Sequence, residues 1–266
     1  MARTHGEEKH AKKGGGILYG LAMLACAGVF LVCAFLLVQR YWKDQQAANE
    51  FADLETLIEP QAAAPGATPA PEDNSEKFSR LYEKNKDFIG WIAIDGTNLS
   101  FPVMQRRDSP NFYLRHNFSG VYSVYGVPYL DGACTLAPAG RPQSNNLIVY
   151  GHNMKTGTIF GCLTGYKTAA YYAGHPQITF DTLYGDGTYE VYAAFAIDVV
   201  KDTSFAYNTY TDMDEKTFGA FVSEVKRRSD VDSGITPVYG DTLLTLSTCE
   251  YSSDNGRYVV CARKVD

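Results

Sequence analysis

A long uncharged run near the N-terminus constrains this chain more than any other feature. Residues 17–38 read ILYGLAMLACAGVFLVCAFLLV and contain no Asp, Glu, Lys or Arg. About 20 apolar residues are enough for a helix to cross a bilayer. A buried helix of a soluble protein is the poorer alternative, because such helices rarely run this long without a polar face. The run therefore predicts a transmembrane anchor over residues 17–38.

The residues that flank this run predict its orientation. The preceding segment carries more basic than acidic residues: Arg3, Lys9, Lys12 and Lys13 against Glu7 and Glu8. An excess of Lys and Arg favours the cytoplasmic side. A cleavable signal peptide is the alternative, but its apolar core is usually shorter and is followed by a small-residue cleavage site. We therefore expect a cytoplasmic tail over residues 1–16, a single membrane pass, and the remainder of the chain outside the cell.

The next segment, residues 39–74, is expected to link the anchor to a domain. Residues 39–59 show a helical pattern that places Phe51, Leu54, Leu57 and Ile58 on one side. The following PQAAAPGATPAPEDN holds four prolines among alanines, a composition typical of a semi-rigid spacer. We interpret residues 39–74 as a stalk.

Residues 75–266 have the pattern of a mostly β domain. Its first segment, SEKFSRLYEK, predicts a helix capped by Ser75 with Phe78, Leu81 and Tyr82 on one face. Short β-rich runs follow: GWIAI, FPVMQ, NNLIVYGH, ITFDT, YEVYAAFAIDVV, DTLLTLSTC and RYVVCARKV. LYGDGTY predicts a hairpin between two of them. Many short strands at this spacing indicate a β-barrel or a sandwich.

One helix is expected between two late strands. Residues 211–230 place Phe218, Phe221, Val222 and Val225 at the spacing of a helix face. The capping pair is either Thr211 with Asp214 or Asp212 with Glu215, and the helix ends in basic residues that suit its negative pole.

The composition restricts the classes of partner and cofactor that this protein is expected to bind. A net charge of −6 without a basic stripe argues against a nucleic-acid partner. Four cysteines lie beyond the apolar run: Cys134, Cys162, Cys249 and Cys261. An even number in an exported protein is compatible with disulfides, although a domain of this size does not need them. The cysteines form no CxxC pair, so they carry no zinc signature, and we expect no metal or other cofactor.

Cys249 and Arg257 end and begin two neighbouring β-rich runs. If residues 242–249 and 257–265 pair as adjacent strands, residues 250–256 form their connection, and the two side chains face each other at one rim. A thiol with a pKa of about 8.5 needs a nearby base or cation to become a nucleophile. His152 also follows a β-rich run and is the best candidate for the base.

A structural role is the competing interpretation for each of these residues. A cysteine that ends a buried strand is most often a small buried side chain, and Arg257 has the position of a surface charge that opens an edge strand. Cys261 falls in mid-strand and is expected in the core. His116 and His175 lie in loop-like sequence and are expected to be ordinary surface residues.

The combination TLSTC, a downstream Arg in NGRYVV and an upstream YGHN resembles the sortases, membrane-anchored cysteine transpeptidases of Gram-positive bacteria. NKDFIGWIAIDGTNLSFPVMQ, YLRHNFSGVYSVYGVPYLD and CEYSSDNGRYVV are similar to class B in particular. The resemblance covers roughly residues 75–265. It implies a closed sortase-like β-barrel with an N-terminal helix and a helix inserted between late strands.

The resemblance also implies roles for individual residues. Cys249 is similar to the family nucleophile, His152 to its histidine and Arg257 to its arginine. Substrate contacts are implied for Ser247, Tyr150, Leu114 and Glu250, the last through its backbone N–H at an oxyanion. The implied reaction cleaves a sorting motif after Thr, forms a thioester and transfers the protein to a peptidoglycan amine. Surface proteins with sorting signals, peptidoglycan or its lipid-linked precursor, and the membrane are the implied partners.

Two other classes of function stay open on the residues alone. A membrane-anchored cysteine peptidase would use the same Cys249 and His152 but admit water to the acyl-enzyme. A non-enzymatic surface protein would leave Cys249 no more reactive than Cys162.

Overall fold

The computed structural model describes residues 14–58, 74, 76–138, 140–154 and 157–265. The chain divides into two compact units, Met1–Glu50 and Phe51–Asp266, which are treated separately below. Most of the expected cytoplasmic tail and of the proline-rich segment lies outside the described residues.

The first unit is formed by the helix α1, Gly14–Glu55, which continues into the second unit. Its stretch Tyr19–Trp42 has a mean hydropathy of 2.8 and is long and apolar enough to cross a bilayer. The amphipathic residues 39–55 form no separate helix. They continue α1, because neither glycine nor proline interrupts the sequence between residues 39 and 59.

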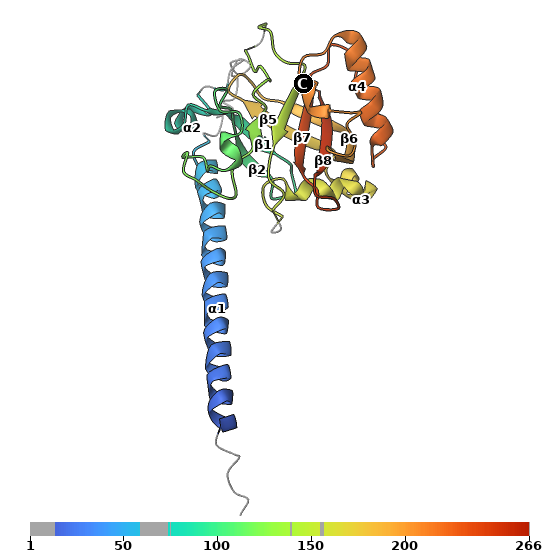
Figure 1. The fold of residues 1–266 in the computed structure, drawn as a ribbon. Coiled ribbons are helices and arrows are strands. Elements are labelled where there is room, and N and C mark those ends of the chain that lie inside the picture. The colour runs from blue at the N-terminus through green and yellow to red at the C-terminus, as the bar shows by residue number, and fades with distance from the viewer. Residues whose placement is uncertain (1–13, 59–73, 75, 139, 155–156, 266) are drawn as a thin grey trace, which may run out of the picture. The chain divides into compact units, whose positions relative to one another are not determined.

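The second unit is built around a closed barrel in the order β1-β2-β3-β4-β7-β8-β6-β5, which confirms the expected barrel architecture (Figure 1). The strands are β1 Phe88–Ala93, β2 Ser100–Met104, β3 Tyr129–Leu130, β4 Asn146–Tyr150, β5 Gln177–Thr182, β6 Thr188–Asp198, β7 Leu243–Cys249 and β8 Gly256–Lys264. Seven of them match the β-rich runs; β3 has only two residues and no recognisable pattern. The hairpin expected at LYGDGTY joins β5 to β6.

Alternating side chains separate the barrel interior from an outer layer. Leu244, Leu246 and Val260 belong to the buried cluster inside the barrel. Their neighbours Leu243 and Val259 point to the opposite side of the sheet and join a second buried cluster. Such period-two alternation is expected when both faces of a strand are covered.

The outer cluster is covered by α4, Glu215–Arg228, the helix expected between two late strands (Figure 1). Phe218, Phe221, Val222 and Val225 are all buried, as the periodicity predicts. The N-cap differs from both expected pairs. Asp214 caps the helix, and its carboxylate accepts a hydrogen bond from the Thr217 N–H at 2.7 Å, because the helix begins later than the sequence pattern suggests.

Three short helical segments complete the connections between strands. They are the 3-10 helices η1, Phe112–Leu114, and η2, Gly161–Lys167, and the α-helix α3, Ala169–Gly174. A further 3-10 turn, η3, spans Tyr207–Thr209 between β6 and α4.

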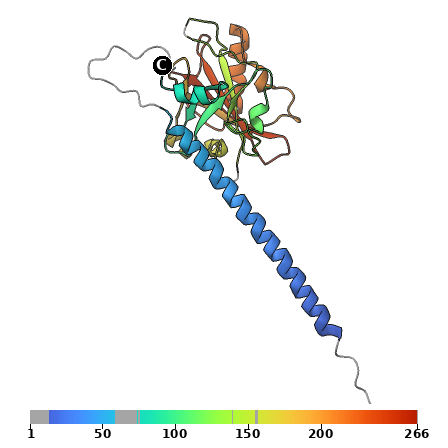
Figure 2. The same ribbon diagram turned by 90° about the vertical axis from the view of Figure 1, so that its left-hand side faces the viewer.

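The helix expected at the start of the domain is α2, Ser79–Lys84, which packs near β1 (Figure 2). Phe78 stands at its N-cap position, so the expected cap at Ser75 is wrong; residue 75 itself lies outside the described residues. Phe78 and Leu81 are fully buried. Tyr82 is 39% exposed and carries the Lys86 ammonium over its ring, so it does not belong to the buried face.

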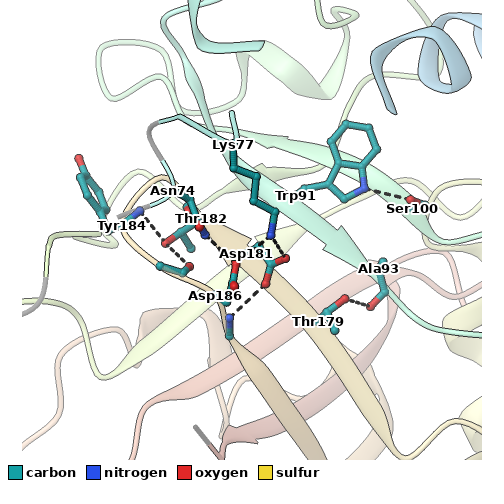
Figure 3. A network of polar contacts seen from close by, with 12 residues as sticks. Asn74, Lys77, Trp91, Ala93, Ser100, Thr179, Asp181, Thr182, Tyr184 and Asp186 are labelled. Carbon is teal, nitrogen blue, oxygen red and sulfur yellow. Dashed lines mark hydrogen bonds and ion pairs between the residues drawn. The ribbon is translucent and has the colours of Figure 1, made fainter. Parts of the chain in front are cut away.

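A polar network fastens the residues just before α2 to the β5–β6 hairpin (Figure 3). The Asn74 side chain donates to the Thr182 carbonyl at 3.1 Å and to the Asp186 carboxylate at 2.8 Å. Lys77 forms ion pairs with Asp181 and Asp186 at 2.8 and 2.9 Å. Asn74 and Lys77 are therefore held against the β5–β6 hairpin.

The end of α1 also belongs to the second unit. Phe51 packs edge-on against Phe101, with ring centroids 4.9 Å apart. Leu54 is 6% exposed, and Ser100 donates a hydrogen bond to Glu55 at 2.7 Å. Described residues on both sides of positions 59–73 thus contact the second unit, and the interpretation of residues 39–74 as a stalk stays a prediction.

Candidate active site

Cys249 and Arg257 are direct partners across the antiparallel pair β7 and β8, as the spacing of the two runs predicts. Arg257 is also paired with Ile197 of β6. Since β8 lies between two strands, Arg257 does not open an edge strand. The two side chains are both half-buried at one rim of the barrel.

Ser247 shares the outer face of the sheet with Cys249, because the two residues stand two positions apart in β7. Ser247 is only 2% exposed. Its hydroxyl is 2.7 Å from the Tyr207 hydroxyl, and Tyr207 itself is buried. The residue expected to line a substrate groove is thus covered by a tyrosine of η3.

The parallel pair β4 and β7 brings the histidine segment to the same rim. Tyr150 is the register partner of Ser247, and the Gly151 N–H donates to the Ser247 carbonyl at 3.1 Å. If this register continues for two more residues, His152 comes opposite Cys249. A hydrogen bond joins the two segments directly, since the Asn153 amide donates to the Cys249 carbonyl at 2.8 Å.

The His152 imidazole contacts the backbone of η1. Its Nε2 lies 2.8 Å from the Leu114 carbonyl oxygen. Burial lowers the pKa of His152, an effect that the Leu114 bond opposes and the nearby Arg115 charge reinforces. In the described part of the chain, no hydrogen bond joins the imidazole to the Cys249 thiol. Leu114, expected as a substrate contact, therefore also orients the histidine.

The Gly256 carbonyl oxygen accepts hydrogen bonds from two groups of this site. It accepts the Glu250 N–H at 2.9 Å and the Arg257 Nη1 at 2.9 Å. In this structure the Glu250 N–H closes the β7–β8 hairpin, and its role at an oxyanion stays a prediction. Among the residues described, Arg257 has no carboxylate partner, and its fork retains further donors.

The Glu250 side chain faces away from solvent. It is 2.8 Å from the Lys167 ammonium of η2 and also bonds Ser252. The Lys167 bond, and then the Ser252 bond, hold the pKa of Glu250 at about 2. The Glu250 carboxylate is therefore held in an ion pair, next to Cys249 in the sequence.

Two tyrosines and an aspartate extend the site toward β3. Tyr150 donates to the Asp131 carboxylate at 2.7 Å, and its ring packs against Tyr129, with centroids 5.4 Å apart. Burial raises the pKa of Tyr129 to about 12, with opposing effects of Asp131 and Arg257. Sequence reasoning identified Tyr150 but gave no role to Tyr129, which lies within the quoted segment YLRHNFSGVYSVYGVPYLD, or to Tyr207, which lies outside the quoted segments.

The remaining cysteines are unlike Cys249. Cys134 and Cys261 are fully buried, and burial raises the pKa of each thiol to about 12. Cys162 is half-buried in η2, and burial raises its pKa as well. All six cysteines are free thiols, so the disulfide alternative is not realised in this structure. His116 and His175, the histidines expected at the surface, are half-buried, and each lies within hydrogen-bond distance of a backbone carbonyl, that of Phe112 in η1 and that of Asp95 in a turn.

Comparison with known proteins indicates the family of this chain. Residues 92–265 match the sortase domain family model. Sortase B of Staphylococcus aureus is 29% identical over 237 residues, covering 88% of this chain and 91% of that protein. Sortase B of Listeria monocytogenes is 26% identical over 245 residues, covering 91% and 94%.

Solved structures give the same result for the fold. A Staphylococcus aureus sortase B–substrate complex matches with a TM-score of 0.71 and 28% identity, covering 85% of this chain and 99% of that one. Sortase B from B. anthracis matches with a TM-score of 0.71 and 25% identity, with the same coverage. Since the family model spans more than half of the chain, this protein belongs to the sortase family of cysteine transpeptidases, in its class B.

Proposed function

We propose that Cys249, His152 and Arg257 carry out a transpeptidation that joins surface proteins to the cell wall. The substrate is a C-terminal sorting motif, cleaved after Thr, and the acceptor is an amine of peptidoglycan or of its lipid-linked precursor. The observation that carries the proposal is the direct register pairing of Cys249 with Arg257, beside the segment that holds His152. The Staphylococcus aureus sortase B that this chain resembles forms a complex with a substrate, which supports a substrate-binding role for the same site here.

Cys249 is the nucleophile in this proposal. His152, neutral because burial lowers its pKa, takes the thiol proton as the sulfur attacks the threonine carbonyl. A tetrahedral oxyanion forms. It collapses as the C–N bond breaks, and the imidazolium donates its proton to the leaving amine. The thioester that remains is attacked by the acceptor amine, His152 removes the amine proton, and the thiol is regenerated.

Arg257 stabilises the oxyanion. Its charge persists at every working pH, and its planar fork presents several donors. One donor already bonds the Gly256 carbonyl, and in the described residues no carboxylate neutralises the guanidinium. The fork can therefore hold the backbone carbonyl of its own hairpin and still reach the substrate.

The apolar helix supports a membrane location for this reaction. We infer that Tyr19–Trp42 spans the bilayer once, with the N-terminus in the cytoplasm and the barrel outside. A substrate that is still crossing the membrane would then meet the enzyme on its outer side. Protease treatment of intact protoplasts tests this orientation, since it should digest the barrel but spare an N-terminal tag.

A peptide-library assay tests the activity. The full chain in detergent is incubated with candidate sorting peptides and either a wall-like amine or hydroxylamine. We expect a peptide–amine adduct with the wild type, none with Cys249→Ala, and a normal yield with the control Cys162→Ala. Hydrolysis without any adduct would support a peptidase instead.

A further inference from the structure

Asn153 links the segment of His152 to the strand end that holds Cys249. Its side-chain amide donates to the Cys249 carbonyl at 2.8 Å, across 96 positions of sequence. Its own carbonyl accepts a hydrogen bond from the Tyr251 hydroxyl at 2.6 Å. Asn153 therefore forms hydrogen bonds with Cys249 and Tyr251, the residues on either side of Glu250.

The Asn153 amide continues the β4–β7 ladder beyond the point where the main chain leaves it. In this parallel ladder, the Gly151 N–H donates to the Ser247 carbonyl. With a period of two residues, the next bond would join the backbone N–H of residue 153 to the carbonyl of residue 249. The structure has the side-chain Nδ2 of Asn153 in that place. The amide therefore keeps the two chains together while the backbone turns to present His152.

The loop after Asn153 is closed on itself. Asn153 forms an isolated antiparallel bridge with Ile159, and the Phe160 N–H donates to the His152 carbonyl at 3.0 Å. Ile159 is 2% exposed and has a φ of +58°, a value that β-branched residues rarely adopt. Such a conformation persists only where the surroundings enforce it, and it is typical of functional sites. The backbone around His152 is thus held from several sides.

We propose that Asn153 is a positioning residue, whose amide fixes the separation between the His152 imidazole and the Cys249 thiol. The inference rests on the proposed function, since it concerns the same two catalytic side chains. Asn153 touches neither the thiol nor the imidazole through a hydrogen bond; it acts by holding their backbones. A displacement of about 1 Å between reacting groups costs on the order of 100-fold in rate.

The test compares four variants of the full chain, one of which, His152→Ala, serves only as the reference for the alkylation profile. Asn153→Ala removes the amide, and Asn153→Gln keeps an amide donor on a longer side chain. The control is Asn145→Ala at the opposite end of β4, where another half-buried asparagine amide donates to a backbone carbonyl, that of Met213, at 2.7 Å. Peptide cleavage is measured as kcat and KM, together with the melting temperature and the pH dependence of Cys249 alkylation by iodoacetamide.

We expect Asn153→Ala to lower kcat by about 10- to 100-fold with little change in KM. Asn153→Gln should recover part of that loss, and Asn145→Ala should keep native kcat. The alkylation profile of Asn153→Ala should shift toward that of His152→Ala, because both changes remove the histidine from the thiol.

Three results would overturn the inference: native kcat in Asn153→Ala, an equal loss of kcat in Asn145→Ala, or an alkylation profile identical to that of the wild type. Failure of the proposed function looks different, because wild-type protein would then form no peptide–amine adduct. The alkylation profile still tests the role of Asn153 in that case, since it does not depend on turnover.

Discussion

His152 donates its Nε2 hydrogen to the carbonyl oxygen of Leu114 over 2.8 Å. A carbonyl oxygen only accepts, so the proton of the neutral ring resides on Nε2 and the lone pair on Nδ1. Since burial lowers the pKa of this imidazole, the neutral form predominates near neutral pH. Nδ1 is then the atom that can receive the thiol proton.

The lowered pKa of His152 predicts the acid limb of the rate profile. A protonated imidazole cannot accept the thiol proton, so activity is lost as the pH falls through the pKa of His152 in the folded protein. We expect kcat/KM for peptide cleavage to decline only below about pH 6.5, the ordinary value for histidine. The free-enzyme pH profile measures this limb, and a decline that begins above that pH would contradict the assignment.

The same shift has a consequence for stability. The unfolded chain binds a proton at His152 more readily than the folded protein does. The contribution of His152 to the free energy of unfolding is therefore fully present above the unfolded pKa of about 6.5 and is lost as the pH falls below it. Urea unfolding at several pH values should show this dependence. In His152→Gln it should be weaker, and an unchanged dependence would mean that the imidazole is not held neutral by burial.

Arg257→Lys should lower the rate of acylation by about 10²–10³-fold, because an ammonium lacks the planar fork that holds the Gly256 carbonyl and the substrate at fixed positions. Arg263→Lys is the matched control: this arginine lies on the same strand and pairs with Glu190 at 3.2 Å, away from Cys249. Burst-phase kinetics of acyl-enzyme formation measure the effect. Equal losses in both variants would show that Arg257 only stabilises β8.

Thiol-directed labelling should distinguish Cys249 from the other cysteines of the barrel. Cys134 and Cys261 are fully buried, with thiol pKa values raised to about 12, and burial also raises the pKa of Cys162. Thiolate is the reactive species, so Cys249 should be alkylated first. Peptide mapping by mass spectrometry after brief iodoacetamide treatment checks the order. Faster labelling of Cys162 would favour a non-enzymatic role.

Leu54→Ala should destabilise the second unit by roughly 2 kcal/mol, at the lower end for a buried leucine. Leu54 is 6% exposed and belongs to the cluster that includes Phe78 and Phe88. Thr56→Ala, at an exposed position of the same segment, is the control. Urea unfolding of the full chain in detergent provides the comparison. No effect from Leu54→Ala would show that this segment adds little to the stability of the second unit.

Local patterns accounted for most of the elements. Short β-rich runs identified seven of the strands in the described residues, and the spacing of Phe218, Phe221, Val222 and Val225 identified α4. The boundaries were less predictable. Asp214 rather than Thr211 or Asp212 caps α4, because several consecutive residues there are able to cap and only packing selects one.

For the site itself, the sequence alone determined the pairing of Cys249 with Arg257, because a short connection between adjacent antiparallel strands sets their register. Only the tertiary structure decided how His152 reaches them, since the parallel pairing of β4 with β7 joins segments far apart in the chain. It also decided that Tyr207 covers Ser247, a residue 40 positions further along the chain. These contacts depend on barrel closure, and no local periodicity encodes a closure between distant strands.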